Sequence, residues 1–136
     1  MIINHHYTIN YRPTNDFLFR FDNGHVSYQG YEITFNKTAL DLASIDLKND
    51  PTTRQTVLVN SLGFMGDSNA CLVYVQLQIV EERLVLIANF RSQSHRYGRP
   101  TDDKLLNYIA TSILKNLGNI KHADILVNVG NYHDNS

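Results

Sequence analysis

Two apolar, strand-like runs followed by a helix-like segment constrain the fold of this chain more than any other feature. Residues 71–80 alternate between two faces, as a half-buried β-strand does, and residues 84–90 form a second apolar run after a polar turn. Residues 102–117 place apolar side chains at helical spacing, and Gly118 follows as a stop signal. We therefore expect an α+β domain in which one long amphipathic helix packs on a sheet.

Weaker patterns add further elements. Residues 17–22 and 25–35 predict a β-hairpin around an Asn-Gly turn, and residues 36–48 contain good helix formers whose spacing fits a helix only loosely. Residues 56–62 and 123–130 predict two more strands, whereas residues 1–12 show no clear period. Within the strand 71–80, the alternation places Leu72 on the more polar face, opposite Cys71 and Val75.

Length and composition exclude several classes of protein. A chain of 136 residues suits a single compact domain, residues 1–136, and a net charge of -1 gives no general attraction to nucleic acid or anionic lipid. One cysteine excludes an internal disulfide and a thiolate zinc cluster. No signal peptide or membrane-spanning stretch is visible, so we expect a soluble cytoplasmic protein without a metal site.

Three motifs in the central stretch carry the chemistry. They are the lone Cys71, the pair Arg91-Ser92, and a Gly98-x-Pro100-x-Asp102 turn. Their order and spacing resemble thymidylate synthase and its relatives, the deoxycytidylate hydroxymethylases. In that family a nucleophilic cysteine on one strand precedes an Arg-Ser pair at the end of the next. The resemblance implies a thymidylate synthase-like mixed sheet and a pyrimidine nucleoside monophosphate as ligand.

Flanking segments extend the resemblance over about three quarters of the chain. Residues 48–54 resemble the family's Lys-Asn-Asp-Pro segment, and residues 24–36 resemble its first hairpin, with Arg20 at the phosphate-loop position. The resemblance implies a homodimer in which Arg54 reaches across the interface into the partner's site. It also implies one catalytic and six substrate-binding residues. The catalytic residue is Cys71, and the substrate-binding residues are Arg20, Arg54, Arg91, Ser92, Asp102 and His133.

Elementary chemistry supports these roles beside simpler explanations. A thiolate at Cys71 could attack C6 of a pyrimidine, although lone cysteines often pack as small apolar side chains. Arg91 and Ser92 suit a phosphate dianion, but a solvated surface arginine is the alternative. Asp102 offers only acceptors and so matches the amino group of cytosine, predicting dCMP over dUMP; it also suits a helix N-cap. His133 either reaches the sugar or belongs to a polar tail.

Departures from the family pattern fall on the catalytic side. The chain contains no tryptophan, residues 36–48 stand in place of a long helical insertion that holds an essential glutamate, and Leu72 replaces a histidine. We therefore expect no folate site and assign no cofactor. Three functions stay open: an enzyme acting at C5 of a pyrimidine nucleotide, a nucleotide-binding protein without chemistry, and a dimeric interaction protein.

Overall fold

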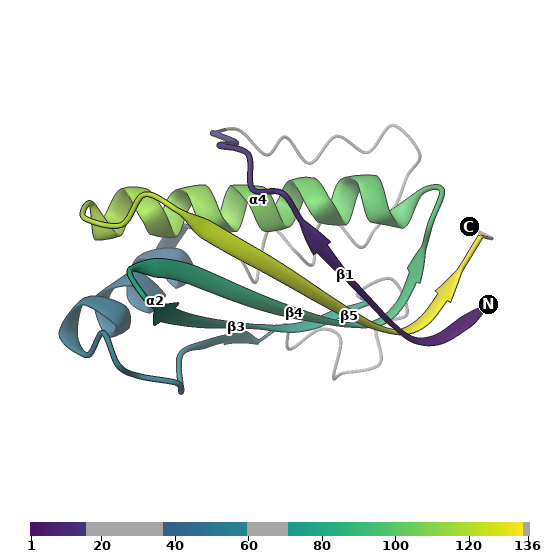
Figure 1. The fold of residues 1–136 in the computed structure, drawn as a ribbon, viewed down its shortest axis with the longest axis horizontal. Coiled ribbons are helices and arrows are strands. Elements are labelled where there is room, and N and C mark those ends of the chain that lie inside the picture. The colour runs from purple at the N-terminus through teal and green to yellow at the C-terminus, as the bar shows by residue number, and fades with distance from the viewer. Residues whose placement is uncertain (16–36, 60–70, 135–136) are drawn as a thin grey trace.

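The computed structural model describes residues 1–15, 37–59 and 71–134. Two helices and five strands follow one another along these residues (Figure 1). In chain order they are β1 (Ile2–Ile9), α2 (Lys37–Asn49), β2 (Val57–Val59), β3 (Leu72–Val80), β4 (Arg83–Ser94), α4 (Gly98–Leu117) and β5 (Ala123–His133). The hairpin expected over residues 17–35 lies outside the described residues.

The five strands form one mixed sheet in the order β1-β5-β4-β3-β2. The β4 and β5 strands are parallel and are joined through α4, whereas the other neighbours are antiparallel. A parallel pair needs a crossover connection, and α4 supplies it by returning the chain along the sheet. Because of this crossover, the ends of β4 and β5 and the start of α4 lie at the same end of the molecule (Figure 1). The expected α+β fold with a mixed sheet is confirmed.

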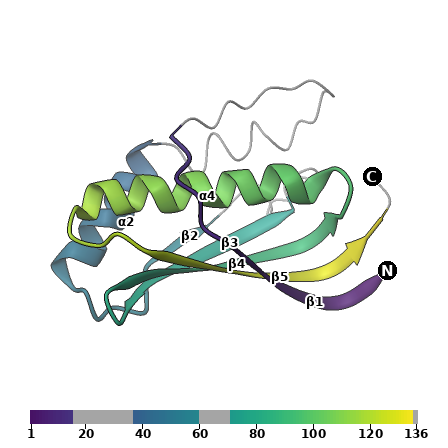
Figure 2. The same cartoon turned by 45° about the horizontal axis from the view of Figure 1, so that its top comes forward.

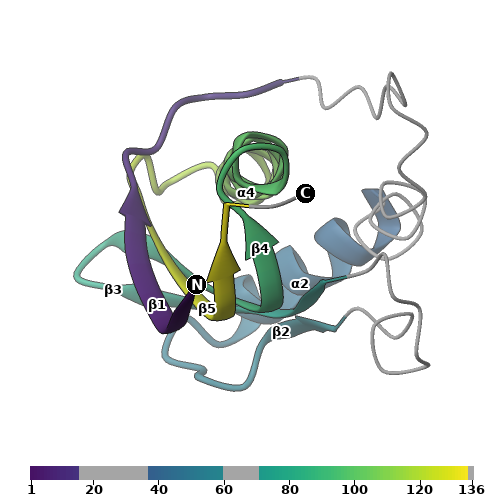
Figure 3. The same ribbon diagram turned by 90° about the vertical axis from the view of Figure 1, so that its right-hand side faces the viewer.

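Both helices pack on the same face of the sheet. Viewed along α4, the strands curve beneath it and α2 lies beside it above β2 (Figure 3). Buried α4 side chains recur three or four residues apart, and they meet the inward-facing side chains of β4 and β5 in one hydrophobic core. Each large apolar side chain buried there contributes roughly 1.5–3 kcal/mol. The fully buried ones include Leu40, Leu77, Leu86, Leu105, Ile109 and Ile125.

The orientation of one side chain and the ends of several elements differ from those expected from the sequence. Leu72 was assigned to the polar face, but its exposed fraction is 0%, because a register shift between Leu72 and Tyr74 turns it into the core. The helix begins at Gly98 rather than at Asp102, since a proline in the first turn sacrifices no helical hydrogen bond. The strands β4 and β5 continue to Ser94 and His133.

The N-terminal residues form a strand that the sequence did not predict. In β1, exposed side chains alternate with half-buried ones at His5, Tyr7 and Ile9, and the strand pairs with β5 along its length. Of these inward side chains only Ile9 is aliphatic, so a run of alternating apolar residues is absent and periodicity does not reveal the strand. Within the described residues, neither helix is long and apolar enough to cross a membrane.

Candidate functional site

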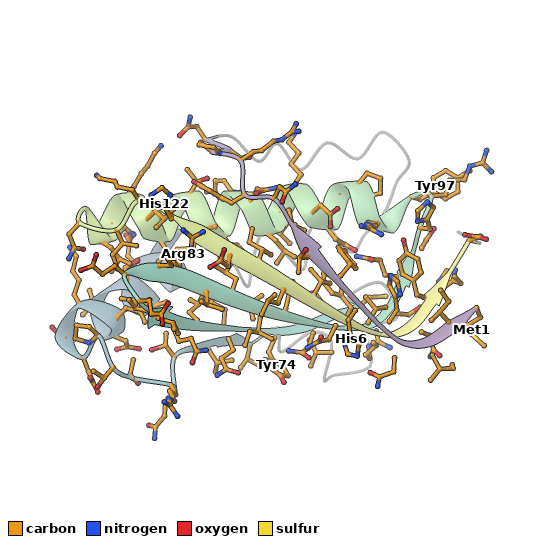
Figure 4. All side chains as sticks on the ribbon, in the orientation of Figure 1. Met1, His6, Tyr74, Arg83, Tyr97 and His122 are labelled. Carbon is orange, nitrogen blue, oxygen red and sulfur yellow. The ribbon has the colours of Figure 1, made fainter. Side chains whose placement is uncertain are left out.

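The predicted site residues concentrate at one end of the sheet. At this end β4 and β5 finish, β1 begins and α4 starts, as the turned view shows (Figure 2). Tyr97, the residue before α4, marks this end in Figure 4, and Arg83 marks the opposite end. Three parts of the chain that are far apart in the sequence, namely β1, the connection from β4 to α4, and the end of β5, therefore contribute side chains to a small region.

Cys71 and Arg91 are backbone neighbours at this end. The amide of Arg91 donates a hydrogen bond of 2.8 Å to the carbonyl oxygen of Cys71, extending the antiparallel pairing of β3 and β4 by one step. Cys71 is half-buried against the core, and Arg91 is exposed. The arrangement places a thiol and a guanidinium on adjacent strands, as the sequence spacing predicted.

Ser92 and His133 meet through their side chains. The Nε2 atom of His133 lies 3.2 Å from the Oγ atom of Ser92. The parallel register of β4 and β5 pairs Ser92 with Asn131 and Ser94 with His133, and the backbone amide of His95 donates to the His133 carbonyl at 2.7 Å. His133 is thus fixed in a strand, so the alternative of a polar tail is wrong for this residue.

Asp102 lies in α4 and does not cap it. The residue at the N-cap is Tyr97, without a side-chain cap, so the predicted capping role of Asp102 is wrong. Its carboxylate is 6% exposed and accepts a hydrogen bond of 3.1 Å from Nε2 of Gln93, which is itself 3% exposed. A Cβ atom added to Gly98 would lie 3.6 Å from Oδ2 of Asp102, so this glycine packs closely over the carboxylate.

Several residues at this end were missed by the sequence analysis. We call them the aromatic cluster; they are His5, Tyr7, His95, Arg99 and Tyr132. The Arg99 guanidinium lies 3.8 Å from the Tyr7 ring centroid and donates a hydrogen bond of 3.0 Å to the Tyr132 hydroxyl. His95 also hydrogen-bonds this hydroxyl, and the His5 ring stacks on Tyr132 at 4.2 Å. The signals in the sequence were the locally basic run of residues 95–99, which contains His95 and Arg99, and the position of Arg99 inside the Gly-x-Pro turn.

The half-buried Tyr7 phenol of this cluster contacts a half-buried carboxyl, that of Asp103. The hydroxyl of Tyr7 lies 2.8 Å from Oδ1 of Asp103 and 3.0 Å from Oε1 of Gln93. Burial raises the pKa of Tyr7 far above its ordinary value, and the charge of Asp103 adds to the shift. Burial also raises the pKa of Asp103, while Tyr7 and Arg99 act against it. Tyr7 therefore keeps its proton at neutral pH.

Of the two remaining predicted arginines, the structure describes only Arg54. Arg20 lies outside the described residues. Arg54 is exposed, and its carbonyl oxygen lies 3.5 Å from Nε2 of Gln76. Since an extended strand rises about 3.3 Å per residue, Gln76 is roughly 17 Å along β3 from Cys71. Within one chain, Arg54 is therefore not part of the group formed by Cys71 and Arg91.

Other features of the described residues do not compete with this site. A cavity of about 400 Å³ lies between the end of α2 and the start of β2. Its lining includes Asp46 and Asp50, whose negative charges disfavour a phosphate. Throughout residues 1–15, 37–59 and 71–134, no group of three or more His, Cys, Asp or Glu side chains is placed to hold a metal ion.

Comparison with known proteins supports the fold. No protein-family model and no curated protein matches this sequence. Among solved structures, the fold resembles thermostable thymidylate synthase A from Bacillus subtilis, with a TM-score of 0.58 and 22% identity over 68% of this chain and 34% of that one. It also resembles thymidylate synthase from T4 phage, with a TM-score of 0.61 and 16% identity over 77% and 37%. The chain thus has a thymidylate synthase-like fold, and it matches about a third of the length of these enzymes.

Proposed function

We propose that this protein binds a pyrimidine deoxynucleoside monophosphate, with dCMP favoured over dUMP, at the end of the sheet where β4 and β5 finish. The observation that carries the proposal is the meeting of Cys71, Arg91, Ser92 and His133 through the Arg91–Cys71 backbone bond and the His133–Ser92 contact. They lie on β4, on β5 and at the position just before β3, and they are among the residues that the thymidylate synthase resemblance assigns to the nucleotide site.

Phosphate binding falls to Arg91 and Ser92. A guanidinium offers a planar pair of donors that matches a phosphate dianion, and a hydroxyl adds a further donor. Arg20 is the third proposed phosphate ligand. His133 lies 3.2 Å from Ser92, and this proximity supports the proposal that it contacts the sugar next to the phosphate.

Base recognition falls to Asp102. Its buried carboxylate offers acceptors to the exocyclic amino group of cytosine, whereas the carbonyl oxygen of uracil would face it with like polarity. Because an unpaired buried polar group costs about 1–3 kcal/mol, we expect a preference for dCMP of about tenfold or more.

Cys71 supplies the reactive group. Its thiolate adds to C6 of the ring, and the displaced electron pair produces an enamine-like C5 that accepts a proton from solvent. Loss of the original C5 hydrogen and expulsion of the thiolate restore the base, so hydrogen exchange needs no further reactant. Transfer of a one-carbon group to C5 would need a separate electrophile. We assign no folate to this role, because the chain has no tryptophan to stack on it and α2 is only 13 residues long.

The face of the sheet that lies away from both described helices supports the homodimer. Strand registers align Thr8, Leu126, Ile87, Gln76 and Val57 in one row across all five strands, on the face opposite the helices. Leu126 and Val57 in this row are 38% and 43% exposed. Packing two such faces together would bury these apolar side chains.

Arg54 precedes β2 at the edge of this sheet, so a partner's site is the destination we propose for its side chain. Sedimentation velocity tests the arrangement. Leu126→Arg should shift the protein to monomers, whereas Leu42→Arg, at an exposed position on α2, should not. A monomeric wild-type protein would contradict the dimer.

Titration calorimetry with dCMP, dUMP and deoxycytidine tests the binding function. We expect dCMP to bind most tightly, and Ser92→Ala to weaken dCMP while leaving deoxycytidine unchanged. Equal affinity for dCMP and dUMP, or a preference for dUMP, would contradict the assignment of Asp102.

Release of labelled C5 hydrogen from dCMP, without folate, separates the remaining functions. Exchange that Cys71→Ser abolishes supports the enzyme. Tight dCMP binding without exchange supports a nucleotide sensor, sponge or inhibitor, an alternative favoured by the absence of tryptophan. Absence of both leaves a dimeric interaction protein.

A further inference from the structure

We infer that Tyr7 and Gln93 determine the choice between cytosine and uracil by holding Asp102 as a hydrogen-bond acceptor. This inference rests on the proposed nucleotide site and identifies two specificity-determining residues that do not themselves bind the base. They lie on β1 and β4, whereas Asp102 lies on α4, so the folded structure alone assembles the chain of contacts.

The geometry is a short chain of directed hydrogen bonds. The Tyr7 hydroxyl lies 3.0 Å from Oε1 of Gln93, and Nε2 of Gln93 lies 3.1 Å from Oδ2 of Asp102. Gln93 and Asp102 are 3% and 6% exposed, so bulk water cannot readily take the place of either partner. A phenol that donates to the amide oxygen leaves the amide NH₂ pointing at the carboxylate.

The opposite orientation of the amide carries an electrostatic cost. If Gln93 turned over, its oxygen would face Oδ2 of Asp102, and two acceptors would meet in a buried site unless the carboxyl took up a proton. A protonated Asp102 would present a donor and would suit the carbonyl of uracil. The orientation of Gln93 is therefore coupled to the base that Asp102 accepts.

Tyr7 is a donor that persists at neutral pH and is itself fixed in place. Its ring lies beneath the Arg99 guanidinium at 3.8 Å, and Asp103 lies 2.8 Å from its hydroxyl. When Asp103 is ionised, its carboxylate competes with the Gln93 amide oxygen for the single phenol proton of Tyr7. When Asp103 is protonated, it can donate to Tyr7 and leave that proton for Gln93. Burial raises the pKa of Asp103 and so shifts it toward this second arrangement, whereas Tyr7 and the Arg99 guanidinium act against the shift.

The test is the ratio of dCMP to dUMP affinity, measured by calorimetry on the full chain. Tyr7→Phe keeps the ring beneath Arg99 and removes the hydroxyl that donates to the Gln93 amide oxygen, so we expect the preference for dCMP to fall about tenfold, the upper end of what one neutral hydrogen bond contributes. Gln93→Glu changes the middle residue of the same chain of hydrogen bonds, and its result does not depend on whether the Tyr7→Phe variant folds. It should also lower the preference, because two adjacent carboxyls would share a proton.

Tyr11→Phe is the matched control. Its hydroxyl lies 2.9 Å from Oγ1 of Thr111, so the same change is made in the segment that follows β1 without touching Gln93. It should keep the wild-type ratio. A purely structural role for Tyr7 and Gln93 would weaken both nucleotides equally and leave the ratio unchanged in their variants, which would overturn this inference alone. A wild-type protein that binds neither nucleotide would overturn the proposed function and this inference with it.

Discussion

The amide of Arg91 donates a hydrogen bond to the carbonyl oxygen of Cys71 at 2.8 Å, so the only thiol of this chain lies beside a guanidinium-bearing residue on the neighbouring strand. This relationship connects the first and second motifs of the sequence in space. Cys71 is also the chain's only cysteine, so any cysteine-directed reagent can react at this position only.

Alkylation of Cys71 should be slowed by dCMP. A nucleotide whose phosphate is bound by Arg91 and Ser92 would cover the half-buried thiol, so iodoacetamide should react several-fold more slowly in saturating dCMP. The rate is read by mass spectrometry of the intact protein. Deoxycytidine at the same concentration should protect less, and equal rates with and without dCMP would place the thiol outside the site.

Gly130→Ala should disturb the strand end that carries Arg91. A Cβ atom at Gly130 would lie 2.8 Å from the backbone oxygen of Arg91, closer than packing allows, so β4 and β5 must move apart. We expect about 1–3 kcal/mol of lost stability in urea unfolding. Affinity for dCMP should fall with it.

Gly118→Ala is the control for this change. Its φ of 77° strains an alanine by about 1–2 kcal/mol, but no atom lies within 4 Å of the added Cβ, and the residue ends α4 far from Arg91. It should lose stability and keep its dCMP affinity. Unchanged affinity in both variants would show that Arg91 does not bind the nucleotide.

Arg99→Lys should destabilise the aromatic cluster. Lysine lacks the planar guanidinium that stacks on Tyr7 and donates to Tyr132, so we expect a loss of about 1–2 kcal/mol in the free energy of unfolding. Arg96→Lys is the comparison, because the exposed Arg96 lies 5.5 Å from the ring of Tyr97 and should change stability by less than about 0.5 kcal/mol. Equal effects would mean that the half-buried stack of Arg99 on Tyr7 adds no stability.

Asp103→Asn and Asp124→Asn should change the pH dependence of stability in opposite directions. Burial raises the pKa of Asp103, so the folded protein binds more protons than the unfolded chain above pH 3.8 and loses stability as pH rises through that window. Asp103→Asn removes this loss, and its stability relative to wild type should rise with pH.

The second carboxyl has the opposite sign. The hydrogen bond from Arg83 lowers the pKa of Asp124, so its contribution is present above pH 3.8 and is lost as pH falls through the lowered value. Asp124→Asn should therefore lose stability relative to wild type as pH rises. Urea unfolding from pH 3 to pH 8 measures both slopes, and equal slopes would contradict the burial of Asp103.

The sequence by itself determined the elements whose hydrophobic pattern is local. The α4 helix, the strands β3 and β4 and the stop at Gly118 follow from side-chain periodicity, which reports directly on one buried face. The motifs containing Cys71, Arg91-Ser92 and Asp102 could also be recognised from the sequence, because the spacing of these residues along the chain is itself the signal.

Only the tertiary structure decided which residues meet at the end of the sheet where β4 and β5 finish. Tyr7 lies on a strand without apolar alternation, Leu72 is turned inward by a register shift, and Asp102 became a partner of Gln93 once α4 began four residues early. Each outcome depends on contacts between residues distant in sequence, and the free energy of such contacts has no local pattern. The residues proposed for the thiol and for phosphate binding could thus be named from the sequence, whereas the contacts of Tyr7 and Gln93 with the Asp102 carboxylate required the fold.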